Sequence, residues 1–257
     1  MTGEQLWVAY TTLVRKEVGR FLRVWGQTLV PPVITTTLYF LIFGTFIGTQ
    51  IKPISGFSYM QFIIPGLVML TIIMSSFQNT VSSFFGAKFQ RAIEEFMVSP
   101  TPYWVIILGF VTGALLRALL VGIIVFSISL FFTDITILHL GVVVLFAIMT
   151  AILFALAGLA NAIFAENFDD ISIFPTFVLT PLTYLGGIFY SVNALPAFWH
   201  RVSEWNPIFY MINGFRYGFL GISDVSVMKS FIVLTLFCVL FAVADWWLFK
   251  TGHGLRS

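Results

Sequence analysis

One arginine stands inside a long apolar stretch of this sequence, where charged side chains are rare and usually functional. Arg117 lies thirteen residues beyond Trp104, which is ~20 Å along a helix that rises 1.5 Å per residue. A guanidinium in the middle of hydrocarbon costs roughly 3 kcal/mol or more, so we expect a partner or water beside it. The acidic candidates for that partner are Glu166, Asp169, Asp170 and Asp245. Such a pair would either fix helix packing or act as a conformational latch; alternatively, Arg117 contacts a substrate.

A second group of candidate residues lies in the segment 86–103, GAKFQRAIEEFMVSPTPY. Its apolar stripe consists of Phe89, Ile93, Phe96 and Met97. Arg91 and Glu95 have the four-residue spacing of a helical ion pair, and two prolines end the pattern. The pattern predicts a short amphipathic helix over 86–98. This helix either only closes the loop or docks a partner, with Glu94 and Glu95 offering charge and Phe96 an apolar anchor.

The segment 191–226 is too aromatic for a solvated loop and is interrupted by Asn206-Pro207 and several glycines. We expect two short re-entrant helices that dip into the outer half of a bilayer, provided that protein or water satisfies their ends. The candidates for an outer gate in this segment are Asn206, Pro207, Tyr210 and Arg216. Packing of the two re-entrant helices would explain the same residues.

The common catalytic motifs are absent from the sequence. It contains no GxxxxGK[ST] phosphate loop, no HExxH and no GxSxG. The three histidines are scattered, and the single cysteine, Cys238, permits neither an intrachain disulfide nor a thiolate metal site. We therefore expect no catalytic, cofactor or metal site on this chain, and a net charge of +2 is too small to indicate nucleic-acid binding.

The elements that must position these residues are membrane spans. The chain has 257 residues, of which 59% are hydrophobic and 9% charged, and its mean hydropathy is +0.98. A soluble domain of this size cannot bury so much apolar surface, whereas a bilayer can. The apolar stretches of about span length are 25–48, 58–85, 104–132, 140–165, 171–190 and 227–249. We predict one all-α integral membrane domain with six transmembrane helices, of which the fifth is short and interrupted by proline.

The distribution of basic residues predicts the orientation of these spans. With the N-terminus inside, the cytoplasmic segments carry eight Lys and Arg residues and the outer segments carry four. The positive-inside rule then places both termini in the cytoplasm. Residues 1–24 alternate apolar and basic positions at helical spacing, which predicts an interfacial helix on the inner leaflet. Pro65-Gly66, Pro175 and Pro181 mark places where a span either kinks or hinges.

Three segments resemble the ABC-2 family of ABC-transporter permeases. They are FQRAIEEFMVSPTP at 89–102, FDDISIFPTFVLTPLTYLGGIFYS at 168–191 and NPIFYMINGFRYGFLGI at 206–222. FSYMQFIIPG at 57–66 and the closing GLRS at 254–257 belong to the same likeness, which extends over essentially the whole chain. These matches are long and specific, far beyond a shared hydropathy profile.

The resemblance implies an architecture and a set of partners. Permeases of this family and size have six spans, an N-terminal interface helix and re-entrant helices before the last span. Two copies pair as a homodimer in the bacterial inner membrane with two separate ATPase subunits, which bind the ATP and Mg. The segment matching 89–102 is then the coupling helix, so the residues expected to contact the ATPase are Phe89, Arg91, Glu94, Glu95 and Phe96. Family members are generally exporters, and the sequence does not indicate the cargo.

Two other functions compete with the permease interpretation. An ATP-independent channel or carrier would have the same hydropathy, although the sequence has no recognisable selectivity filter or ring of acidic residues. A membrane-embedded lipid or glycan enzyme would need several convergent ionisable groups within the spans, and these are lacking. The helix at 86–98 discriminates between the functions, because only the ATP-driven permease needs it for docking.

Overall fold

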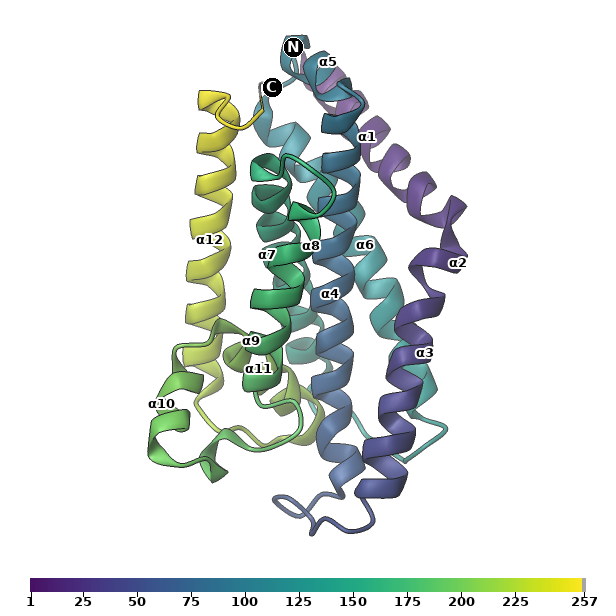
Figure 1. Ribbon diagram of the computed structural model, residues 1–257, viewed down its shortest axis with the longest axis vertical. Helices are drawn as coiled ribbons and strands as arrows, with labels where there is room; N and C mark the ends of the chain where they lie inside the picture. The colour runs from purple at the N-terminus through teal and green to yellow at the C-terminus, as the bar shows by residue number, and fades with distance from the viewer. Residues whose placement is uncertain (256–257) are drawn as a thin grey trace.

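The computed structural model describes residues 1–255, and these form helices joined by short loops (Figure 1). Five helices are long and apolar enough to cross a membrane: Trp25–Ile47, Tyr59–Phe89, Tyr103–Ser129, Leu140–Phe164 and Val227–Thr251. A shorter apolar helix, Asp170–Leu185, precedes the last of these. The prediction of an all-α membrane protein is confirmed.

The helix bounds differ from the predicted ones chiefly near residue 86. The first span comprises α2 (Trp25–Thr28), α3 (Val30–Tyr39) and a π-helical segment, η1 (Phe40–Ile47). The other long spans are α4 (Tyr59–Phe89), α6 (Tyr103–Ser129), α7 (Leu140–Phe164) and α12 (Val227–Thr251). Helix α4 continues to Phe89 and therefore includes residues that we had assigned to the following loop helix.

The fifth apolar helix is broken into three pieces. It consists of α8 (Asp170–Phe174), a π-helical turn η2 (Pro175–Leu179) and α9 (Thr180–Leu185). Pro175 lacks the N–H that an α-helix needs, and the hydroxyl of Thr180 donates to the Pro175 carbonyl at 2.9 Å. The three pieces total sixteen residues, which is ~24 Å at 1.5 Å per residue. The helix is thus shorter than the predicted 171–190.

Helix α4 forms the centre of the bundle and packs against α6, α7 and α11 (Pro207–Leu220). In its most apolar stretch 83% of the residues are buried, against 11% in the first span and in α12. Gly66 allows the close approach of a loop to α4, because a Cβ at this position would lie 3.0 Å from the Ile188 Cα. The first span and α12 therefore lie at opposite edges of the bundle, with their apolar surfaces facing outward (Figure 1).

Helix α1 (Gly3–Arg23) packs obliquely against α6 (Figure 1). Gly109 and Gly113 provide the contact surface on α6, because a Cβ at these positions would overlap the side chains of Leu13 and Glu17. The buried face of α1 consists of Leu13, Glu17 and Phe21, whereas Trp7 is 65% exposed. The N-terminal helix therefore buries a carboxylate inside the protein in addition to presenting aromatic residues outward.

The short helices lie at opposite ends of the bundle. Helix α5 (Ala92–Val98) lies at the end that also holds Met1 and the C-terminal turn after α12 (Figure 1). At the other end, 3-10 turn η3 (Val192–Ala194), α10 (Ala197–Glu204) and α11 precede the last span. Helix α11 packs among α4, α7 and α12, and twelve of its fourteen residues are buried.

Candidate functional site

A groove runs along one side of α4, between the first span and the broken fifth helix. It consists of two cavities of ≈ 530 Å³ and ≈ 310 Å³ that share Met74, Gln78 and Thr180. The larger cavity extends toward α1, and the smaller one extends toward the ends of α3 and α9. We call these two cavities together the groove, and their two ends the α1 end and the α9 end.

Two tyrosines close the α9 end of the groove. The hydroxyl oxygens of Tyr39 and Tyr184 lie 3.2 Å apart and share a hydrogen bond, although the residues are 145 positions apart in the sequence. Phe189 packs on both tyrosines, with ring centroids 6.1 Å from each, and Phe43 lies 4.8 Å from the Phe189 centroid. This aromatic cluster joins the first span to the fifth helix where the groove ends.

Hydroxyl side chains line the middle of the groove. Three of them donate to nearby backbone: Thr71 to the Val68 carbonyl at 2.7 Å, Thr180 to the Pro175 carbonyl at 2.9 Å, and Thr183 to the Leu179 carbonyl. Ser75 is an exception, because its buried hydroxyl has no hydrogen-bond partner within the described residues. The middle of the groove therefore presents methyl groups and hydroxyls and no charged side chain, which suits the apolar part of an amphipathic occupant.

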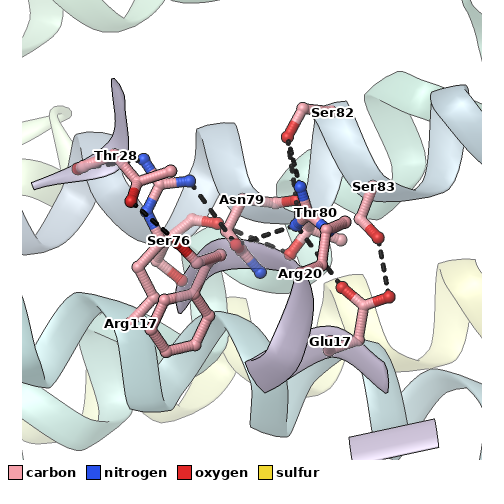
Figure 2. Close-up of polar contacts among 10 residues, drawn as sticks. Glu17, Arg20, Thr28, Ser76, Asn79, Thr80, Ser82, Ser83 and Arg117 are labelled. Atoms are coloured by element: carbon pink, nitrogen blue, oxygen red, sulfur yellow. Dashed lines mark hydrogen bonds and ion pairs between the residues drawn. The ribbon is translucent and has the colours of Figure 1, made fainter. Parts of the chain in front are cut away.

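Two arginines meet at the α1 end of the groove (Figure 2). Arg117 on α6 donates through Nη1 to the Asn79 Oδ1 at 3.4 Å and through Nη2 to the Thr28 carbonyl at 3.4 Å. Arg20 on α1 donates through Nη2 to the same Asn79 Oδ1 at 2.9 Å. Arg117 is only 6% exposed and Asn79 is fully buried. Two guanidinium groups that line a cavity thus converge on one neutral, buried amide oxygen.

One carboxylate accompanies the two arginines. Glu17 is fully buried and accepts a hydrogen bond from the Ser83 hydroxyl at 2.7 Å. Its other oxygen lies 3.4 Å from the Arg20 Nη2, which is the one ion pair found among residues 1–255. The expected ion pair between Arg117 and a distant acid is therefore not formed. We call Glu17, Arg20, Asn79 and Arg117 the arginine cluster.

The acids proposed as partners of Arg117 have other surroundings. Asp170 accepts hydrogen bonds from the backbone N–H groups of Glu166 and Asn167, at 2.9 and 3.1 Å. The Asp169 N–H in turn donates to the Asn167 side chain at 3.0 Å, so this segment forms a local cap before α8. Asp245 is buried on α12, at the edge of the bundle opposite α1 (Figure 1). Among residues 1–255, none of these acids forms an ion pair or a hydrogen bond with Arg117.

Comparison with known proteins identifies the family. The model of the ABC-2 type transporter family matches residues 8–220. The chain belongs to this family. It is 57% identical to the inner membrane transport permease YadH of Escherichia coli K12 over 98% of both chains. It is also 25% identical to nodulation protein J of Rhizobium leguminosarum bv. trifolii, over 79% of this chain and 78% of that protein. It is therefore a multi-pass inner-membrane transport permease, and the groove is its candidate path.

The segment that resembles the ABC-2 coupling helix has a shorter helix than predicted. Arg91 adopts a left-handed backbone conformation with φ 59°, which separates α4 from α5. Arg91 and Glu95 form no ion pair in the described chain, because the helix that would place them four residues apart begins only at Ala92. Glu94 and Glu95 are exposed at the tip, and Phe89 is 65% exposed on the end of α4.

Phe96 does not project away from the bundle as a docking anchor would. It is half-buried, with the Lys16 Nζ 5.1 Å above its ring and the Phe110 ring 6.4 Å away. The exposed apolar residue of α5 is Val98, at 86%. Phe96 therefore connects α5 to α1 and α6. The exposed surface of α5 comprises Glu94, Glu95 and Val98, which we call the α5 tip.

The four residues proposed for an outer gate contact the protein itself. Asn206 caps α11 by accepting from the Ile208 N–H at 3.0 Å and donates to the Leu182 carbonyl at 2.5 Å, and Pro207 occupies the first turn. Tyr210 donates to the Glu204 carbonyl at 2.8 Å. Arg216 donates to the Gly187 carbonyl at 2.5 Å and lies 4.0 Å from the Phe62 ring centroid. These contacts hold α11 in place.

Sequence reasoning missed several residues that line the groove or contact the arginines at its α1 end. They are Glu17, Tyr39, Asn79 and Tyr184. A signal was present for Asn79, since α4 contains an unusually polar run, SSFQNTVSS, for a buried span. The tyrosine pair has no comparable sequence signal, because aromatic residues are common throughout this chain.

Proposed function

We propose that this permease is the membrane subunit of an ATP-driven exporter and that the groove forms half of its translocation path. The observation that carries the proposal is a continuous groove between three membrane elements, with an arginine cluster at one end and an aromatic cluster at the other. A transported molecule needs such a path, because the hydrocarbon on either side cannot solvate its polar groups.

A separate ATPase subunit would dock on the α5 tip and transmit its conformational change to the permease there. The α5 tip lies at the end of the bundle that holds both ends of the described chain, and Phe96 connects it to α1 and α6. Lys88, in the last turn of α4 just before α5, donates to the carbonyls of Ile163 and Ala165 at 2.7 and 2.9 Å, which connects this end of α4 to the end of α7. A displacement of α5 would therefore move helices on both sides of α4.

Two copies of the chain would complete the path, with both termini in the cytoplasm. The groove is open along one side of a single copy, and the first span beside it is largely unburied. A second copy, related by a two-fold axis, would cover the open side and enclose a shared path. ATP and Mg would be bound by the ATPase subunits, because this sequence carries no phosphate loop.

The test is purification of the tagged chain from its native membrane under mild conditions, followed by identification of any protein bound in near-equal amount. We expect a P-loop ATPase, and we expect it to be lost when Glu94, Glu95 and Val98 are replaced by alanine. The control is the pair Phe131→Ala and Asp134→Ala, which changes an exposed apolar residue and an exposed acid in the loop after α6. This control should retain the ATPase.

A passive channel or carrier predicts a different result. Such a protein would transport or conduct without nucleotide and would retain no ATPase, even in nanodiscs with ATP present. A well-folded chain with that behaviour would overturn the exporter proposal, since its α5 tip would then have no docking role.

A further inference from the structure

We propose that the arginine cluster binds the phosphate group of a membrane amphiphile at the α1 end of the groove. The inference deepens the proposed export function and rests on it in one respect: the bound amphiphile represents the cargo class only if the groove is a path. The binding itself is argued from the cluster alone.

The cluster carries more positive than negative charge, and its members are buried except for the partly exposed Arg20. Arg20 and Arg117 both line the ≈ 530 Å³ cavity, and Glu17 is the one carboxylate that pairs with either of them among residues 1–255. Glu17 also accepts a hydrogen bond from Ser83, so part of its charge is already engaged. A buried excess of charge is unfavourable unless a counter-charge enters.

The cluster also has more donors than acceptors. The buried nitrogens without a hydrogen-bond partner include the Nε of Arg20, the Nε of Arg117 and the Nδ2 of Asn79. All three belong to side chains that meet at the Asn79 Oδ1, since both arginines donate to that oxygen. Unpaired buried donors are rare in proteins because each one costs the desolvation of a polar group. Two of the three belong to the arginines that line the cavity, so an acceptor with several oxygens that enters this cavity would meet a cluster with donors to spare.

A phosphate group fits these donors better than a single carbonyl or hydroxyl oxygen. Guanidinium groups bind phosphate oxygens through paired, charge-assisted hydrogen bonds, and they do so more strongly than they bind neutral acceptors. A phosphate offers enough oxygens to accept from the guanidinium groups of Arg20 and Arg117 at once, and both side chains line the cavity. Its negative charge would also balance the excess of the cluster.

The position of the cluster favours a phosphate carried by an amphiphile. The cavity continues into the rest of the groove, which is lined by Pro31, Pro32, Leu70 and Met74 together with the hydroxyl side chains. The exposed surface of the adjoining first span is strongly apolar, so a molecule in the membrane reaches this side of the protein directly. A headgroup at the cluster would leave the attached chain lying along the groove.

The test uses three short-chain probes in titration calorimetry on the full-length protein in detergent. They are a phosphatidic acid, the matching diacylglycerol and inorganic phosphate, which provide headgroup with tail, tail alone and headgroup alone. We expect the phosphatidic acid to bind, the diacylglycerol to bind at least about 10-fold more weakly, and inorganic phosphate to compete. Inorganic phosphate that binds as tightly as the phosphatidic acid would instead assign the site to a free anion. Equal binding of phosphatidic acid and diacylglycerol would overturn the proposal.

Variants connect the binding to the cluster. Arg117→Gln should weaken phosphatidic acid binding by about 10-fold or more, since a charge-assisted hydrogen bond is lost. Arg15→Gln, which removes an exposed arginine from the same α1 helix that carries Arg20, should leave it within about 2-fold. If Arg117→Gln does not fold, Arg20→Gln provides the same test at a half-exposed position. Unchanged binding in a folded variant of either arginine would overturn the proposal.

The binding assay requires no ATPase, which separates the two proposals. Phosphatidic acid binding by a protein that retains no ATPase would contradict the exporter proposal but support the proposed phosphate site. An associated ATPase without phosphate binding would contradict the site alone.

Discussion

Arg117 and Arg216 are both buried arginines in apolar helices, yet their surroundings differ. Arg216 is 4% exposed, lies against the Phe62 ring and donates to the Gly187 carbonyl. Arg117 is 6% exposed, lines a cavity and shares its acceptor with a second arginine. Each retains an unpaired Nε. The difference is that a π face covers the Arg216 guanidinium, whereas Arg117 adjoins open space and like charge.

The comparison shows how the surroundings of a buried arginine distinguish a packing role from a ligand-binding role. Arg216 holds three parts of the fold together, since it lies on α11 and contacts α4 and the loop after α9. Cation–π contacts of this kind contribute about 2 kcal/mol when desolvated. Arg117 makes two long hydrogen bonds of 3.4 Å, which are weak restraints for a charged group. Arg216 therefore serves packing, whereas the weaker restraints on Arg117 agree with the proposed contact to a phosphate.

The largest expected effect is on stability at Arg216. Arg216→Met should lower the thermal midpoint by roughly 5–10 °C, because it leaves the Gly187 carbonyl unpaired and removes the guanidinium from Phe62. Arg117→Gln should lower the midpoint by much less, because the side chain lost is held by two long bonds. Thermal unfolding of the purified variants, followed by tryptophan fluorescence, measures both shifts.

Arg201→Met provides the control for Arg216. Arg201 is an exposed arginine on α10, near the same end of the bundle, so its replacement should change the midpoint only slightly. Equal shifts for the Arg117 and Arg216 variants would contradict the distinction between a ligand-binding and a packing arginine.

A smaller effect of opposite sign is expected at Asn79. Asn79→Asp places a carboxylate between the two guanidinium groups without changing the side-chain volume. We expect the thermal midpoint to rise, by an amount corresponding to about 1–2 kcal/mol, because the internal charge now balances the cluster. The same substitution should abolish phosphatidic acid binding in calorimetry, since the counter-charge is already present.

Asn79→Ser is the matched control for that substitution. It keeps an oxygen at this position but adds no charge, so it should neither raise the midpoint nor exclude the phosphate by charge. A fall in stability for Asn79→Asp would indicate that another group already neutralises the arginines, and it would contradict the excess of positive charge.

The sequence predicts most of this fold because hydropathy acts locally. A run of about twenty apolar residues must form a helix in a bilayer, whatever its neighbours are. The break at Gln90–Arg91 was not predictable in this way. The pattern across 86–98 is helical throughout, and nothing in it marks the left-handed turn at Arg91 that separates α4 from α5.

The candidate site was predictable only in part, because its contacts join distant segments. Arg117 was identified because a charged side chain is energetically unfavourable in hydrocarbon. None of the four acids expected to offset that cost forms an ion pair with it among residues 1–255. Periodicity placed the apolar residues of α1 on one face and assigned no role to Glu17. The close contact with Gly113 buries that carboxylate, and spacing within a single helix does not reveal such a contact.

The smallest expected effect concerns Glu17, and it tests the charge balance of the arginine cluster directly. Glu17→Gln retains an oxygen that accepts from the Ser83 hydroxyl, so the packing of α1 on α4 and α6 should persist. The ion pair that it removes is 3.4 Å long and involves a half-exposed arginine, so its loss costs only about 0.5 kcal/mol of stability. Removing the one competing carboxylate should tighten phosphatidic acid binding about 2- to 5-fold in calorimetry.

A packing role for the cluster predicts the opposite outcome for the same variant. If Arg20 and Arg117 only hold α1 against its neighbours, loss of Glu17 weakens that contact and changes no affinity. Glu4→Gln, which removes an exposed carboxylate from the first turn of α1, controls for the net charge of the helix and should leave binding unchanged. Tighter binding in Glu17→Gln alone would therefore show that the carboxylate and the phosphate compete for the same two arginines, which a purely structural ion pair does not explain.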